Sequence, residues 1–138
     1  MLKKEITFTN FNDEEVTKTY WFNLNKLQAM KLVSANGGID KYLSKVVEDK
    51  NTEKFIDFVE NLVIDAYGRR DENDPEVFDT SDEAKAAFKK SPAFDEFVYS
   101  LLTSEDALIE FILMILPKDM REKLQEALAQ QKALPNNA

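Results

Sequence analysis

The stretch of residues 108–116 constrains the fold more strongly than any other part of the sequence. Glu110 is the one charged residue in it, and the other eight positions are apolar. A helix that is apolar on every side is either enclosed by its own chain or docked on a partner. It is too short to cross a bilayer, which takes about 20 apolar residues. The sequence therefore predicts a helix that lies in the core, binds a partner protein, or does both, and it leaves these alternatives open.

Apolar residues recur with helical spacing through most of the chain beyond residue 25. Residues 39–47 and residues 94–102 are apolar at i, i+3, i+4, i+7 and i+8, and residues 55–67 have a wide apolar arc. In the first of these segments the apolar positions are Ile39, Tyr42, Leu43, Val46 and Val47. The wide arc predicts a central helix that packs on several neighbours.

Helix starts and stops are marked by capping residues. Asn25 with Gln28 and Thr80 with Glu83 have the spacing of capping boxes, Ser91 precedes Pro92, and Gly68 follows the central helix. The expected buried sides are Leu27, Met30 and Val33 in the first helix, and Ala84, Ala87 and Phe88 in the helix after Thr80. Between Gly68 and Thr80 we expect a charged linker.

The first 24 residues alternate with a period of two, which predicts a β-hairpin. Ile6, Phe8, Tyr20 and Phe22 are the expected inward face, whereas Phe11 and Trp21 would point away from it. The free edge of such a hairpin can add a strand from a second copy, so Phe11 and Trp21 are candidate oligomer contacts.

The predicted fold class is α+β and mainly α, an N-terminal β-hairpin followed by a bundle of about six helices. Residues 1–24 form the hairpin, which shares one domain with a helical core at 25–117. Residues 118–138 form a C-terminal helix with a frayed tail.

Charge and residue usage exclude several classes of function. The chain has 26 acidic and 18 basic residues, a net charge of -8, and neither Cys nor His. Such a charge repels phosphate backbones and argues against nucleic-acid binding, and the most common metal ligands and general bases are missing. We expect no catalytic residues, no cofactor and no metal site. The pair Arg69-Arg70 is interpreted as a solvated helix end.

The acidic residues after Arg70 raise the possibility of a calcium loop. A loop starting at Asp71 would need an oxygen ligand at position 75, Gly at 76 and Glu at 82. The chain has Pro75, Glu76 and Asp82 at these positions. We therefore interpret this segment as a solvated acidic loop.

Several strings, taken in order, resemble the tail assembly chaperones of siphovirus-type phages that infect Gram-positive bacteria. They are residues 6–11, residues 20–24, Ala66-Tyr67-Gly68, Ser91-Pro92-Ala93-Phe94 and Ile115-Leu116-Pro117. The segment around Asn73-Asp74-Pro75 departs from the family pattern, which has a Gly-containing turn there.

The resemblance implies a role in the host cytoplasm during tail morphogenesis. The chain would bind the tape measure protein, keep it soluble, and leave when tail tube protein replaces it. A structural part of the virion, in the tail or the head–tail connector, is the alternative, and a small protein-binding adaptor is a third. We expect the client to dock by an apolar helical stripe on a groove that seven residues line or support: Phe94, Phe97, Leu101, Leu108, Phe111, Ile112 and Ile115.

Overall fold

A computed structural model of the chain describes residues 1–35, 37–38, 41, 44, 53–71 and 73–133. In chain order the elements are β1 (Leu2–Thr9), β2 (Glu15–Phe22), α1 (Lys26–Ala35), α3 (Glu53–Ala66), β3 (Tyr67–Asp71), β4 (Asp74–Asp79), α4 (Asp82–Lys89), α5 (Pro92–Leu102), α6 (Glu105–Ile115) and α7 (Lys118–Ala133). The predicted α+β, mainly helical class is confirmed. The apolar residues expected in a helix at 39–47 lie outside the described residues.

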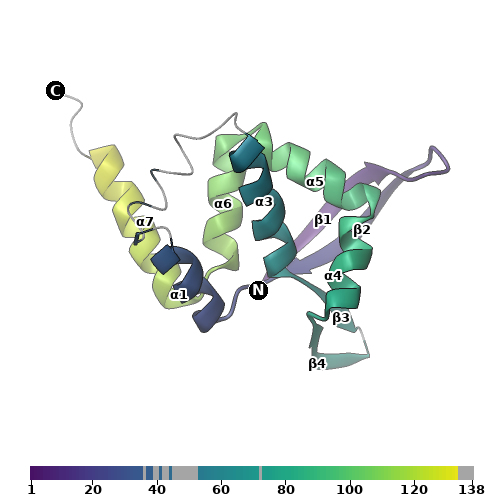
Figure 1. Cartoon of the computed structure of the whole chain (residues 1–138), viewed down its shortest axis with the longest axis horizontal. Helices are drawn as coiled ribbons and strands as arrows, with labels where there is room; N and C mark the ends of the chain where they lie inside the picture. Colours follow the sequence, from purple (N-terminus) through teal and green to yellow (C-terminus); the bar gives the residue numbers. More distant parts are fainter. Residues whose placement is uncertain (36, 39–40, 42–43, 45–52, 72, 134–138) are drawn as a thin grey trace.

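The strands form an antiparallel sheet in the order β1-β2-β3-β4, and the turn of the β1–β2 hairpin projects beyond α5 (Figure 1). β1 and β2 pair along their whole length, from Leu2 opposite Phe22 to Thr9 opposite Glu15. The alternation predicted for the hairpin is confirmed, because Ile6, Phe8 and Phe22 are buried. The side chains between them face outward, so only one face of this hairpin is covered.

The second hairpin, β3–β4, was not predicted, and the expectation of a charged linker is wrong. α3 ends at Ala66, and Tyr67 enters β3 directly, opposite Phe22. Gly68 is therefore a strand residue and not the residue that ends the helix. A Cβ at Gly68 would lie 2.3 Å from the Phe78 ring, so this position needs glycine because a β4 side chain packs against its backbone.

The centre of the core is an aromatic cluster around Phe22, whose side chain is 0% exposed. Its ring centroid lies 5.2 Å from that of Phe97, 5.4 Å from that of Phe111 and 5.9 Å from that of Phe88. Phe88 also stacks on Tyr67, with centroids 4.1 Å apart. Aromatic pairs of this kind add about 0.5–1.5 kcal/mol each beyond their area burial. The cluster thus joins β2 to α4, α5 and α6.

Several predicted helix starts are confirmed. Ser91 accepts a hydrogen bond from the Phe94 N–H and stands before Pro92. The Asn25 side chain accepts from the Gln28 N–H at 2.8 Å, and the Gln28 side chain accepts from the Asn25 N–H at 3.0 Å. The start predicted at Thr80 is displaced by one residue, because Ser81 is the N-cap and accepts from the Ala84 N–H.

The expected buried sides of two helices are partly wrong. In α1, Leu27 is 69% and Met30 58% exposed, whereas Ala29 is fully buried. In α4, Ala84 and Phe88 are buried, but Ala87 is exposed. The orientation of a short, weakly amphipathic helix is determined by the elements that it packs against. The apolar spacing alone therefore predicted the wrong buried side for α1.

Two helices that do not end at a glycine have carbonyls at their C-terminal ends bound by a cationic side chain. The Lys85 ammonium of α4 donates to the carbonyls of Ile64, Asp65 and Tyr67, at 2.6, 3.1 and 3.0 Å, where α3 passes into β3. Burial lowers the pKa of Lys85, and the carboxylates of Asp65 and Asp82 partly oppose this shift.

Arg121 of α7 does the same for α6. Its guanidinium donates to the carbonyls of Leu113, Met114 and Leu116, at 2.8, 3.2 and 3.2 Å. Cations at these positions also complement the negative end of the helix dipole.

Candidate protein-binding surfaces

The seven residues predicted to line or support a client groove all lie in the core. Their exposed fractions range from 0% at Ile115 to 7% at Phe94. They come from α5 and α6, which pack on each other and on the inner face of the hairpin. The apolar character of residues 108–116 is thus largely explained by burial. In this conformation these residues can support a surface, but they do not form an open one.

Three of the seven nevertheless line a small cleft between β1, α5 and α6, which we call the α5–α6 cleft. Its volume is about 70 Å³. Its lining residues are Leu2, Lys4, Phe97, Ser100, Leu101, Ala107, Glu110, Phe111 and Met114. The apolar floor comes from Phe97, Leu101 and Phe111, while Met114, which is 37% exposed, reaches the surface.

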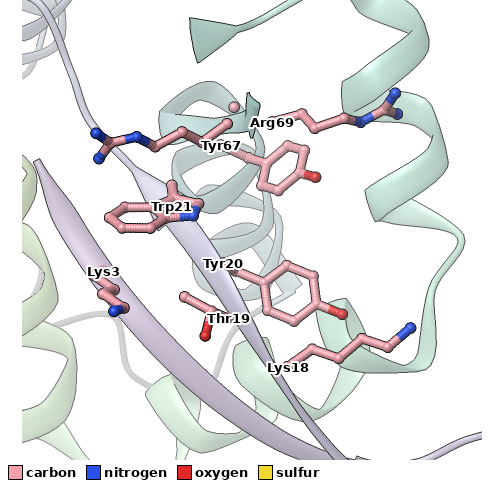
Figure 2. A pocket seen from close by; sticks show the side chains of 9 residues that line it. Lys3, Lys18, Thr19, Tyr20, Trp21, Tyr67 and Arg69 are labelled. Carbon is pink, nitrogen blue, oxygen red and sulfur yellow. The ribbon is translucent and has the colours of Figure 1, made fainter. Parts of the chain in front are cut away.

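A second hollow, which we call the cationic pocket, lies where β3 separates from β2 (Figure 2). Its volume is about 340 Å³, and its lining residues are Lys3, Lys18, Thr19, Tyr20, Trp21, Tyr67, Gly68, Arg69 and Arg70. Four of these nine residues are cations and none is acidic, in a chain whose net charge is -8. The pocket therefore carries a local charge opposite to that of the whole protein.

The register of the sheet explains how the pocket forms. Lys3, Trp21 and Gly68 stand opposite one another on three neighbouring strands, so they share the outer face. The Lys3 ammonium lies 5.5 Å and the Arg70 guanidinium carbon 4.6 Å from the ring centroid of Trp21. Such cation–π contacts hold the indole between two charges.

Both tyrosines at the pocket have a raised pKa. Burial raises the pKa of Tyr20, with a smaller contribution from Tyr67. Burial also raises the pKa of Tyr67, although a hydrogen bond and the charge of Arg69 oppose the shift. Both hydroxyls are therefore protonated at neutral pH and available as neutral hydrogen-bond donors.

The predicted oligomer contacts lie at two different places on the hairpin. Phe11 is 85% exposed at the turn, and Trp21 lies in the cationic pocket. The pocket itself was missed, because Arg69-Arg70 was interpreted as a helix end. No local signal marked this strand, because glycine is depleted in strands.

The described part of the chain offers no cluster suited to a metal. No group of three or more Asp or Glu side chains there could hold an ion. In the same part of the chain, no helix is long and apolar enough to span a membrane.

An apolar cleft and a pocket of paired cations and aromatic rings are features of protein-binding surfaces, in which aromatic residues, Met and Arg are enriched. The fold and its two surfaces thus define a small protein-binding module. Along residues 1–138 the sequence matches the family described as phage tail assembly chaperone, and the chain belongs to this family. The resemblance of its ordered motifs to tail assembly chaperones is thereby confirmed. No curated protein and no solved structure matches the chain.

Proposed function

We propose that this chaperone binds the tape measure protein in the host cytoplasm and keeps it soluble until tail tube protein replaces it. The proposal rests on the α5–α6 cleft and on the family to which the chain belongs. The cleft has an apolar floor of Phe97, Leu101 and Phe111, and its mouth is flanked by one cation and one carboxylate, Lys4 and Glu110.

The shape of the cleft suits a client that must later be released. A volume of about 70 Å³ accepts the tip of an apolar side chain but cannot enclose a helix. A long client with repeated apolar residues would be held by many such shallow contacts, each of which exchanges quickly. Tube subunits with a larger interface would then displace the chaperone by mass action.

The charge of the chain supports the same role. A net charge of -8 keeps neighbouring complexes apart while an apolar client is held at high local concentration. The apolar contact supplies the affinity, and the acidic surface supplies the solubility.

The test is co-expression with the tape measure protein of the same phage. Met114→Glu places a charge at the mouth of the cleft without entering the core, because this side chain is 37% exposed. We expect it to reduce the yield of soluble tape measure protein at least fivefold. Phe111→Asp is a poorer probe, because Phe111 is 3% exposed and a charge there would unfold the chain.

Ile56→Glu is the matched control, since Ile56 is 39% exposed on α3 and does not line the cleft. It should leave the yield unchanged. Equal yields with Met114→Glu and with the unmodified chain, at equal thermal stability, would refute the proposed site. Adding purified tail tube protein should release the chaperone from the soluble complex.

A further inference from the structure

The edge of β2 that faces β3 is paired only at its C-terminal end, where β3 pairs with Trp21 and Phe22. Within the described chain, no strand pairs with residues 15–20 on this side, and residues 17–19 are exposed. We call this stretch the open edge of β2. Its free N–H and C=O groups can pair with another extended segment.

The cationic pocket lies where the open edge begins. Lys18 and Thr19 of the edge line the pocket together with Arg69 and Arg70 of β3 (Figure 2). Its volume of about 340 Å³ lies within the usual range of ligand sites, about 300–1,000 Å³. Asp79 stands opposite Arg69 on β4 and offsets part of its charge, but the nine lining residues include none with a negative charge. The pocket therefore selects a negatively charged group.

The other end of the open edge has the opposite charge, because Asp13, Glu14 and Glu15 are exposed where the hairpin turns. A ligand that follows the edge from the pocket meets positive charge first and negative charge last. A uniformly anionic chain such as a nucleic acid is repelled at the turn, and the net charge of -8 adds to this repulsion. A peptide can carry carboxylates at one end only, and its backbone supplies the donors and acceptors that a strand edge requires.

We propose that the cationic pocket and the open edge of β2 together bind an extended segment of a partner protein that is acidic at its N-terminal end. The carboxylates enter the pocket, and the residues that follow pair with residues 15–19. All pairs of the sheet are antiparallel, so the segment runs in the direction of β3, from the pocket towards the turn. Trp21 gains no new strand partner, because Gly68 already pairs with it. The inference does not depend on the client of the α5–α6 cleft.

The fluorescence of Trp21 reports on this site. Trp21 is the one Trp of the chain and lines the pocket, so its emission detects a bound peptide without a label. The probe is the synthetic peptide EEETVTVTK with blocked ends, which is acidic at its N-terminal end and has no aromatic residue. We expect a saturable change in emission with a dissociation constant below about 1 mM. Added salt should weaken the binding.

The reversed peptide KTVTVTEEE is the matched control for direction, because it has the same composition and net charge. In antiparallel pairing its carboxylates lie at the acidic turn, so it should bind at least fivefold more weakly. Equal affinity of the two peptides would overturn the proposal. So would an oligomer of deoxythymidine that binds more tightly than EEETVTVTK, since the site would then be one for nucleic acid.

Two matched variants test the pocket. Lys18→Gln/Arg69→Gln removes two exposed cations of the pocket and should weaken binding of EEETVTVTK by about fivefold or more. Lys118→Gln/Lys123→Gln makes the same change of net charge on exposed positions of α7 that do not line the pocket. It should bind the peptide like the unmodified chain, and circular dichroism verifies that both variants fold. Equal affinity of the two variants would refute the pocket as the binding site.

Peptide N-methylation tests strand pairing separately from charge. In an antiparallel pair, the N–H groups of alternate residues point towards the neighbouring strand, and those of the residues between them point away. One derivative of EEETVTVTK is N-methylated at its two valines and the other at its first two threonines, which lie on opposite edges of the extended peptide. One of the two should lose at least fivefold in affinity, and the other should bind like the parent peptide. Equal affinities of the two derivatives would refute the proposed edge.

Discussion

Replacing Lys85 with methionine tests whether α3 and β3 are held together by one half-buried cation. Methionine keeps most of the apolar stem but cannot donate to the carbonyls of Ile64, Asp65 and Tyr67. Hydrogen bonds from a charged group contribute about 1.5–3 kcal/mol each when fully formed. Here three hydrogen bonds share one ammonium that is partly exposed, so solvent screening reduces their summed contribution to stability. A cation at a helix end contributes at most about 2 kcal/mol in comparable settings.

We therefore expect Lys85→Met to lower the free energy of unfolding by about 2 kcal/mol, which lowers the melting temperature by roughly 8 °C for a chain of this size. Urea denaturation followed by circular dichroism measures the first quantity, and calorimetry measures the second. Lys89→Met on the same helix is the control, because Lys89 is exposed. A loss below about 0.5 kcal/mol at Lys85, the range of ordinary surface substitutions, would refute the assigned role.

Two further predictions concern the junction between α3 and the sheet. Gly68→Ala should destabilise the fold by about 1–3 kcal/mol, because its Cβ would overlap the Phe78 ring. The penalty should be smaller in a Phe78→Leu background. Urea midpoints of the unmodified chain, the two single variants and the double variant measure this, and additive effects would contradict the contact. Burial raises the folded pKa of Tyr67 above its ordinary 10.0, so above pH 10 the folded chain binds more protons than the unfolded chain, and stability falls as the pH rises towards the folded pKa. Tyr67→Phe should therefore reduce the loss of stability between pH 10 and 11. Urea titrations measure this loss, and an unchanged slope would contradict the prediction.

The elements that the sequence predicted well are those whose local signals agree with their burial. The hairpin and α5 have clean periods, and the start of α5 is marked by Ser91. Phe22 was expected on the inward face of the hairpin and is fully buried. In these segments one pattern fixes both the type of element and the side that faces inward.

The sheet beyond β2 could not be predicted, because its causes are tertiary. Residues 67–79 have few apolar side chains, and β3 depends on partners outside its own hairpin, namely Trp21 and Phe22 of β2 and the Lys85 ammonium. None of these partners is close in sequence. The cationic pocket was missed for the same reason, since Lys3 and Arg70 meet at Trp21 only after three strands have aligned. For the client surface, the apolar content of α5 and α6 did not distinguish a helix that faces a partner from one that fills the interior.

The alternation of β2 places Phe22 and Trp21 on opposite faces of one strand. Phe22 touches Phe97 and Phe111 beneath the α5–α6 cleft, and Trp21 forms part of the cationic pocket. A single peptide bond thus separates a residue that packs beneath the cleft from a residue that lines the cationic pocket. Any influence of a ligand at one face on affinity at the other must be equal in the reverse direction, as thermodynamic linkage demands. Binding at one face of β2 is therefore coupled to binding at the other wherever either ligand shifts this strand.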